Sequence, residues 1–318
     1  MDKGIAVLSL FDGISCGQIA LQRAGIKVDK YFASEIDKHA IKVTQHNWPN
    51  TVQLGSVVDV KAEGFPKIDL LCGGSPCQSF SIAGNGEGFD GKSGLFFEWL
   101  RLLREIKPKY FLLENVLMRK EWEDKITEFI GVKPVMISSA NFSPQARNRL
   151  YWTNIPFNKS FPENNIFLFD ILEENVDSKY FLSNSYTLKS LKENKSRLEI
   201  LKENYRPNYK KSRQSPVLVS EVVGDTPSGR SRQTDRLYSA LSKSPTLLAN
   251  RACDLKIDCG SSEIIKWRTL TALEAERLQT VPENYTSCVA EPQRFKCLGN
   301  GWTVDVIAHI FKGLKNEV

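Results

Sequence analysis

The sequence lacks the features that mark several common classes of protein. No apolar run approaches the ~20 residues that a membrane-spanning helix needs, so we expect no association with a membrane. The three histidines are dispersed and no two cysteines are spaced as CxxC, which argues against a metal site. The seven cysteines are scattered and odd in number, as is typical of reduced thiols. The first strand-like run also lacks the pattern of a signal peptide. Together with reduced thiols, this lack predicts a cytoplasmic protein.

The net charge gives only a weak indication of the kind of partner that the protein binds. The 318 residues carry a formal net charge of +6, with a pI of about 8.8. This balance mildly favours a polyanionic partner, although many enzymes of small molecules are equally basic. The length suffices for one large domain or two modest ones, each with a sizeable core.

Short apolar runs alternate with amphipathic stretches over the first 155 residues. We expect strands at 5–11, 28–34, 67–72, 109–115 and 132–138, and helices at about 15–25, 37–46, 94–106 and 119–130. This alternation predicts an α/β fold with a doubly wound, mostly parallel Rossmann-like sheet. Ligands of such sheets bind beyond the carboxyl ends of the strands.

The composition becomes polar and basic after the first domain. Regular patterning returns in an amphipathic helix for which Thr271 is the expected N-cap, with Glu274 three residues later. We therefore expect a ligand-binding catalytic domain over 1–156, completed by 284–318. Residues 157–283 are expected to form a smaller irregular domain that includes the returning helix.

A glycine-containing loop follows the first expected strand. Gly13 and Gly17 open the next helix, where dinucleotide sites bind a pyrophosphate, but Ser15 takes the place of the second glycine of GxGxxG. Glu35 ends the next strand roughly twenty residues later, where an acid can accept hydrogen bonds from both ribose hydroxyls. The pair favours an adenosyl ligand without separating NAD from S-adenosylmethionine. A turn without a ligand, and an acid that serves only a helix N-terminus, are the alternatives.

The stretch GGSPCQSFS presents a cysteine directly after a buried strand. Cys77 is either a lone nucleophile or an inert thiol. Glu114 ends another apolar strand, so it should reach the same edge of the sheet, where a half-buried carboxyl suits proton donation. A thiol and a carboxylic acid are the pair needed to attack an electron-poor ring while protonating it. Arg147 and Arg149 would share one face of an extended segment and suit a phosphate or a carbonyl oxygen.

Seven motifs occur in the order typical of C5-cytosine DNA methyltransferases, and the chain resembles the bacterial and phage enzymes related to the de novo class. The motifs are FDGISCG, SEID, GGSPCQSFS, ENV, QARNRLYW, RLQTVP and LGNGWTVDVI. The resemblance covers the chain apart from about 158–265, where the family keeps its target recognition domain. It implies methyl transfer from S-adenosyl-L-methionine to carbon 5 of a cytosine flipped out of a specific duplex DNA sequence. A covalent cysteine adduct and the product S-adenosyl-L-homocysteine are implied as well.

The resemblance also implies roles for individual residues. Cys77 corresponds to the nucleophile at carbon 6, Glu114 to the acid at ring nitrogen 3, and Arg149, with Arg147 beside it, to the contact with the base carbonyl. The implied cofactor contacts are Phe11, Asp12, Gly13, Ile14, Gly17, Glu35, Ile36, Ser56, Val57, Pro76, Asn300 and Trp302. The implied DNA contacts are Ser79, Ser81, Arg230, Arg232, Gln233, Asn250 and Arg251.

One position departs from the family pattern. Ser56 stands where the family usually has an aspartate that contacts the adenine amino group, and Asp59 follows three residues later. Adenine is therefore expected to be held by Ser56, Val57 and backbone groups, with Asp59 as the alternative contact.

Other functions stay open at this point. A tRNA C5-cytosine methyltransferase would share the fold, but that branch typically carries a Cys-Phe-Thr signature that is missing here. A non-catalytic adenosyl- and DNA-binding homologue is disfavoured by the presence of Cys77, Glu114 and both arginines. The expected partners are double-stranded DNA and a cognate restriction endonuclease in the same cell, and we expect a monomer.

Overall fold

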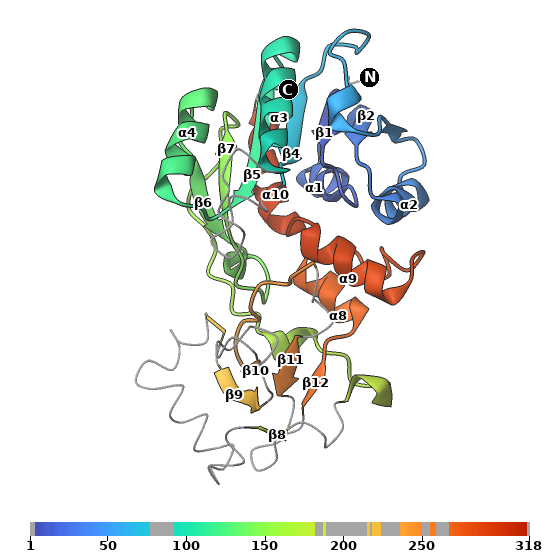
Figure 1. The fold of residues 1–318 in the computed structure, drawn as a ribbon, viewed down its shortest axis with the longest axis vertical. Coiled ribbons are helices and arrows are strands. Elements are labelled where there is room, and N and C mark those ends of the chain that lie inside the picture. Colours follow the sequence, from blue (N-terminus) through green and yellow to red (C-terminus); the bar gives the residue numbers. More distant parts are fainter. Residues whose placement is uncertain are drawn as a thin grey trace. The chain divides into compact units, whose positions relative to one another are not determined.

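The computed structural model describes residues 4–76, 92–181, 187–188, 215–216, 218–223, 236–249, 255–258 and 267–316. The chain packs into two compact units (Figure 1). Unit 1 comprises Met1–Ser138, Asn148–Phe161 and Gly301–Val318, and unit 2 comprises Ser139–Arg147 and Pro162–Asn300. The stretch 284–300 thus belongs to unit 2, whereas the sequence assigned it to the catalytic domain.

Unit 1 is built on a seven-stranded sheet in the order β3-β2-β1-β4-β5-β7-β6. Its strands are β1 (Ile5–Leu10), β2 (Val28–Ser34), β3 (Val52–Gln53), β4 (Leu70–Gly74), β5 (Tyr110–Val116), β6 (Val135–Ser138) and β7 (Asn148–Thr153). The strands from β3 to β5 pair in parallel, and β7 lies antiparallel between β5 and β6. The sheet is therefore mostly parallel, which confirms the predicted fold class.

Each expected helix of unit 1 forms within two residues of its predicted limits. These helices are α1 (Cys16–Ala24), α2 (Lys38–Asn47), α3 (Phe96–Ile106) and α4 (Lys120–Ile130), and α10 (Val304–Phe311) completes the unit. Local signals set their ends. Asp37 caps α2 by accepting hydrogen bonds from the backbone N–H groups of His39 and Ala40. Gly25 ends α1 in the left-handed region, at a φ of 69°.

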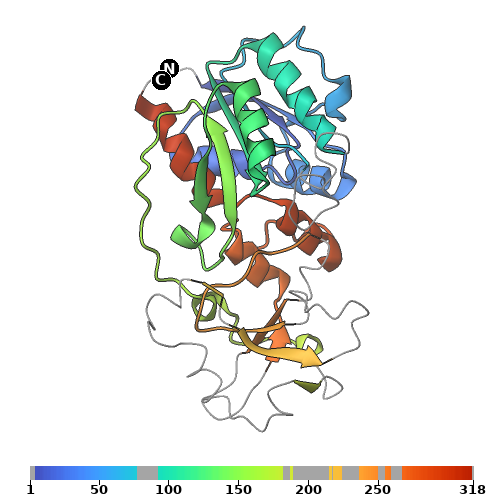
Figure 2. The ribbon, with the colours of Figure 1, turned by 60° about the vertical axis from the view of Figure 1, so that its left-hand side comes forward.

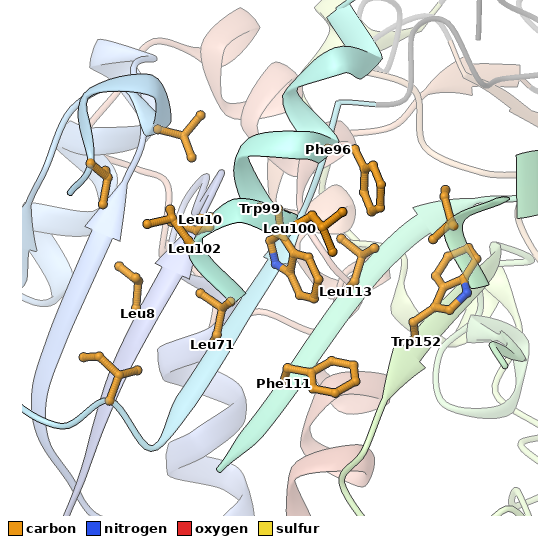
Figure 3. Packing of buried hydrophobic residues seen from close by; sticks show 14 of the residues in the cluster. Leu8, Leu10, Leu71, Phe96, Trp99, Leu100, Leu102, Phe111, Leu113 and Trp152 are labelled. Carbon is orange, nitrogen blue, oxygen red and sulfur yellow. The ribbon is translucent and has the colours of Figure 1, made fainter. Parts of the chain in front are cut away.

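Alternate residues of the strands form the core on the α3 side of the sheet. Trp99 of α3 packs edge-on against Phe111 of β5, with ring centroids 6.0 Å apart. Figure 3 shows this indole among leucines from β1, β4 and β5. Burial of each such side chain stabilises the fold by roughly 1.5–3 kcal/mol. The labelled members of this cluster are Leu8, Leu10, Leu71, Phe96, Trp99, Leu100, Leu102, Phe111, Leu113 and Trp152.

The opposite face of the sheet receives α1 and α10, which pack against each other. Figure 2 shows α10, in red, running beside the strands that begin the chain. The segment that precedes α10 therefore brings residues after Gly301 back to the sheet of unit 1.

Among the described residues, no helix is long and apolar enough to cross a membrane.

Unit 2 contains a smaller sheet in the order β12-β11-β10-β9-β8, in which only β10 and β11 pair in parallel among the described strands. The strands are β8 (Thr187–Leu188), β9 (Leu218–Val223), β10 (Arg236–Ser239), β11 (Lys256–Asp258) and β12 (Trp267–Thr269). Two helices follow, α8 (Ala272–Leu278) and α9 (Glu291–Asn300). Thr271 and Glu274 form the predicted capping box of α8. Because α9 packs on α8, residues up to Asn300 stay with this unit.

A buried lysine ties the short piece 139–147 into unit 2. The ammonium of Lys243 donates hydrogen bonds to the carbonyl oxygens of Ser143, Asn164 and Ile166, at 3.1, 2.8 and 2.8 Å. The three donors of the ammonium are thereby all used. This explains why the segment before β7 belongs to unit 2 although β7 itself belongs to the sheet of unit 1.

Candidate active site

The loop after β1 has an unusual backbone. Phe11, Gly13 and Ser15 all adopt a positive φ, of 55°, 59° and 56°. For the two residues with a Cβ this costs about 1 kcal/mol or more each, and it persists only where the surroundings fix it. The N–H of Asp12 donates to Ser34 O and that of Ser15 to Asp12 O, both at 3.1 Å. The loop is thus held in one shape against the end of β2.

The carboxylate of Glu35 joins this loop to the start of α2. Oε2 accepts the N–H of Gly13 at 2.8 Å, and Oε1 accepts those of Ile36 and Asp37 at 2.7 and 2.8 Å. Among the residues that the structure describes, these contacts use three of the roughly four lone pairs and leave one on Oε2. The neighbouring side chain of Ile36 is 76% exposed. This tip therefore offers one charged acceptor and one apolar surface to a ligand.

The carboxylate of Asp12 is engaged by two hydroxyl groups of the protein. Oδ1 accepts a hydrogen bond from the hydroxyl of Tyr31 at 2.8 Å, and Oδ2 accepts one from the hydroxyl of Ser15. Burial raises the pKa of Asp12 to about 6, although hydrogen bonds from Ser15, Ser9 and Tyr31 oppose the rise. Burial and the charge of Asp12 raise the pKa of Tyr31 well above its usual range.

Gly17 has a packing reason to be a glycine. A Cβ at this position of α1 would lie 2.7 Å from the hydroxyl oxygen of Tyr31 and 3.7 Å from the indole of Trp302. Contacts under 3.0 Å require a shift of one partner. The absent side chain therefore leaves the space in which Tyr31 reaches Asp12. Ile14, in the same loop, is buried.

A carboxylate held from two sides lies at the carboxyl ends of β4 and β5. Arg149 Nε lies 3.1 Å from Glu114 Oε1, and Trp302 Nε1 donates to Glu114 Oε2 at 3.1 Å. Glu114 is only 8% exposed and pairs in register with Gly74. A Cβ on Gly74 would lie 2.8 Å from Glu114 Oε2, so the glycine makes room for the carboxylate. Breaking a buried ion pair of this kind costs about 3–5 kcal/mol, because one charge is left uncompensated.

The turn that leads from β4 toward the cysteine is also fixed. Asn115, next to Glu114, donates through Nδ2 to the hydroxyl of Ser75 at 3.0 Å. Ser75 is buried, and Pro76 follows it as the last described residue before Cys77. Cys77, Ser79 and Ser81 lie outside the described residues. The edge that carries Glu114 thus leads, within three residues of Gly74, to the predicted nucleophile.

Comparison with known proteins shows the family of the chain. The family model for C-5 cytosine-specific DNA methylases matches residues 5–316. The chain belongs to this family. It is 30% identical over 304 residues to the orphan methyltransferase M.SPRI of Bacillus phage SPR, over 80% of this chain and 66% of that protein. It is 31% identical over 327 residues to the type II methyltransferase M.HpaII of Haemophilus parainfluenzae, over 94% of this chain and 86% of that protein.

The fold has solved counterparts among methyltransferases. The structure of the Entamoeba histolytica methyltransferase EhMeth matches with a TM-score of 0.71 at 17% sequence identity, over 99% of each chain. The S. pombe Dnmt2 methyltransferase matches with a TM-score of 0.66 at 19% identity, over 98% of this chain. At such identities the likeness concerns the fold alone. Membership of the C-5 cytosine-specific DNA methylase family rests on the family match.

In this family member the two arginines of QARNRLYW have different partners. β7 begins at Asn148, so Arg147 lies outside the strand and the alternation expected for an extended segment does not apply to it. Its guanidinium is buried in unit 2 and donates to the carbonyls of Leu247 and Gly299, at 3.2 and 3.3 Å. The contacts place Arg147 in the packing of unit 2, whereas Arg149 pairs with Glu114.

The expected adenine contacts lie at the start of the 3-10 turn η1 (Val57–Asp59), which follows β3. Ser56 precedes the turn and is half-buried, and its carbonyl accepts the N–H of Asp59 at 3.1 Å. Val57 is buried in the core and Asp59 is exposed. The side chain of Val57 therefore packs inward, so its backbone is the part left to contact a ligand.

The returning motif of the methylase is divided between the two units. Asn300 is the exposed last residue of α9 in unit 2, and Trp302 belongs to unit 1. The predicted DNA contacts Arg230, Arg232, Gln233, Asn250 and Arg251 lie outside the described residues. The hydrogen bond from Trp302 to Glu114 is one feature of the site that the sequence did not indicate, because the two residues are 188 positions apart.

Proposed function

We propose that this protein transfers a methyl group from S-adenosylmethionine to carbon 5 of a cytosine flipped out of a specific sequence in duplex DNA. One observation carries the proposal. In a member of the C5 family, a buried carboxylate, Glu114, is clamped by Arg149 at the strand edge that leads into the Pro-Cys-Gln motif. That edge is where the fold presents its chemistry.

The residues near the tip of β2 fit an adenosyl group. The open lone pair of Glu35 Oε2 can accept one ribose hydroxyl, and the exposed side chain of Ile36 can cover an adenine ring. Phe11, Gly13 and the turn at Ser56 lie on the loops that follow β1 and β3, the two strands that flank β2 in the sheet. S-adenosylmethionine, when bound, supplies an electrophilic methyl group. The chain holds and orients it through these loops.

The residues at the end of β5 fit a cytosine ring. The thiolate of Cys77 adds to carbon 6, while Glu114 holds the proton at ring nitrogen 3 and Arg149 binds the carbonyl oxygen. Attack of this kind makes carbon 5 nucleophilic, and loss of its proton after methylation releases the cysteine. A free thiol is only a few per cent ionised at neutral pH, so the site has to assist its deprotonation. Extrusion of the base costs a few kcal/mol, which contacts to DNA must offset.

The partners follow from this proposal. Double-stranded DNA is the substrate, and the basic residues of unit 2 are candidates for phosphate contacts. The resemblance to M.HpaII, a type II methyltransferase, and to M.SPRI, an orphan methyltransferase, is compatible with either the presence or the absence of a restriction partner. The cognate endonuclease, the monomeric state and the cytoplasmic location stay predictions.

A labelling experiment tests the proposal. Purified protein is incubated with S-adenosylmethionine that carries a labelled methyl group, and with either plasmid DNA or tRNA. We expect label in 5-methylcytosine of the DNA, at one recurring sequence, and none in the tRNA. Labelled tRNA with unlabelled DNA would overturn the DNA assignment.

A further inference from the structure

The indole of Trp302 lies between α1, which follows the proposed cofactor loop, and the carboxyl group of Glu114. Its indole lies where a Cβ on Gly17 would come within 3.7 Å and where a Cβ on Gly74 would come within 3.1 Å of Nε1. Gly17 belongs to the helix that follows the first loop, and Gly74 ends the strand that leads to Cys77. Gly74 thus leaves space beside the indole nitrogen, and the same ring lies within ordinary contact range of position 17.

The same indole completes the hydrogen bonding of Glu114. Oε1 faces the guanidinium of Arg149 and Oε2 accepts the N–H of Trp302, each at 3.1 Å. The two donors approach different oxygens, so together they fix the rotation of the carboxyl group about its last bond. Each donor alone restrains only one of the two oxygens. Trp302 comes from the segment before α10, and Arg149 comes from β7.

We propose that Trp302 is a positioning residue for Glu114, acting through its indole N–H rather than only as a surface for the cofactor. The inference rests on the proposed function. The indole is half-buried, so part of the ring is left for a ligand while its nitrogen is committed to the carboxylate. A cofactor packed against the ring therefore steadies the carboxyl group that acts on the base. Cofactor occupancy and alignment of the acid are coupled through one side chain.

The proposal separates binding from chemistry. Trp302→Phe keeps an aromatic surface but removes the donor to Oε2. We expect the dissociation constant for S-adenosylmethionine to change by less than about three-fold and the single-turnover rate of methyl transfer to fall about ten-fold or more, the loss typical of one hydrogen bond to a charged group. The KM for DNA should change little. Trp267→Phe in β12 is the matched control, and it should leave the rate unchanged.

A double-mutant cycle distinguishes positioning from general packing. If Trp302 acts through Glu114, then Trp302→Phe should slow the Glu114→Gln variant far less than it slows the wild type. The readout is the rate of covalent trapping on a duplex that contains 5-fluorocytosine. Additive effects, or an unchanged rate in Trp302→Phe, would overturn the proposal. Cofactor affinity lost in step with the rate would do the same, because it would assign the indole to binding alone.

A second replacement keeps the test valid if Trp302→Phe folds poorly. Site-specific incorporation of β-(3-benzothienyl)alanine at position 302 replaces the N–H by sulfur and preserves the size of the ring. It should fold as the wild type, bind the cofactor normally and show the same slow chemistry; a wild-type rate would contradict the proposal. A wild-type enzyme that transfers no methyl group to DNA would instead sink the proposed function, so the two failures are distinguishable.

Discussion

The hydroxyl of Tyr31, in β2, donates a 2.8 Å hydrogen bond to the carboxylate of Asp12, in the loop after β1. Asp12 also accepts the hydroxyl of Ser15, which itself has a left-handed backbone and lies 3.2 Å from the hydroxyl of Thr44 in α2. The loop proposed to hold the cofactor is therefore shaped by buried polar groups behind it. Its conformation depends on side chains of β2 and α2 as well as on its own residues.

Tyr31→Phe should weaken cofactor binding several-fold, about 1 kcal/mol, because the loop loses one hydrogen bond that stabilises its strained backbone. Isothermal titration with S-adenosylmethionine measures the change.

Gly17→Ala should weaken cofactor binding to a similar extent, since its Cβ would lie 2.7 Å from the position of the Tyr31 hydroxyl and would displace it. In the Tyr31→Phe background that substitution should cost much less, because the clashing oxygen is gone. Equal costs in both backgrounds would show that Gly17 is required for another reason.

The raised pKa of Asp12 predicts a dependence of stability on pH. Its folded-state pKa of about 6 exceeds the ordinary value of 3.8. Between these two pH values the folded state therefore binds more protons than the unfolded state. The stabilising contribution is complete below about pH 4 and is lost as the pH rises through about 6, by roughly 1–3 kcal/mol. Thermal unfolding should show that the melting temperature of the wild type falls relative to that of Asp12→Asn between pH 4 and 7. A difference that stays constant with pH would contradict this assignment.

Cys77→Ala should abolish methyl transfer while DNA affinity stays within about two-fold, because the thiol forms the covalent bond but contributes little to the interface. A duplex containing 5-fluorocytosine should trap the wild type, since fluorine on carbon 5 blocks the elimination that frees the cysteine. The complex is detected by its mobility in a denaturing gel. Cys72→Ala is a matched control, because that buried thiol has its pKa raised to about 12 by burial and should be unreactive. A trapped Cys77→Ala protein would exclude Cys77 as the nucleophile.

Five of the seven strands of the central sheet could be predicted because their signals are local, whereas β3 and β7 were not among the expected strands. Apolar runs and amphipathic periods placed the four helices from α1 to α4 within two residues, and Thr271 and Glu274 marked the start of α8. Helix α9 was missed, because its sequence EPQRFKCLGN has few apolar residues and no strong period. Its stability comes from packing on α8, which local patterns do not report.

The predicted site was less complete for the same reason. The order of the motifs predicted that Glu114 and Arg149 both act on the base, and the two side chains form an ion pair. Sequence could not show that Arg147 turns into unit 2, because that depends on where β7 begins. Nor could it show that Asp12 faces inward, since its partner Tyr31 lies on a separate strand. Long-range pairings of this kind are decided by register and packing, not by spacing.

Ser56→Asp should tighten S-adenosylmethionine binding by about 1 kcal/mol, several-fold in dissociation constant. A carboxylate accepts the adenine amino group with a full charge, and charge-assisted hydrogen bonds are roughly twice as strong as neutral ones. Ser56 lies half-buried at the start of the turn that follows β3, whereas Asp59 is exposed at its end. The competing idea gives the contact to Asp59. In that case Asp59→Ala should weaken binding strongly and Ser56→Asp should do nothing or do harm. Calorimetric titration of both variants, with thermal unfolding to check that each folds, separates the two, and the second pattern would reject Ser56 as the adenine contact.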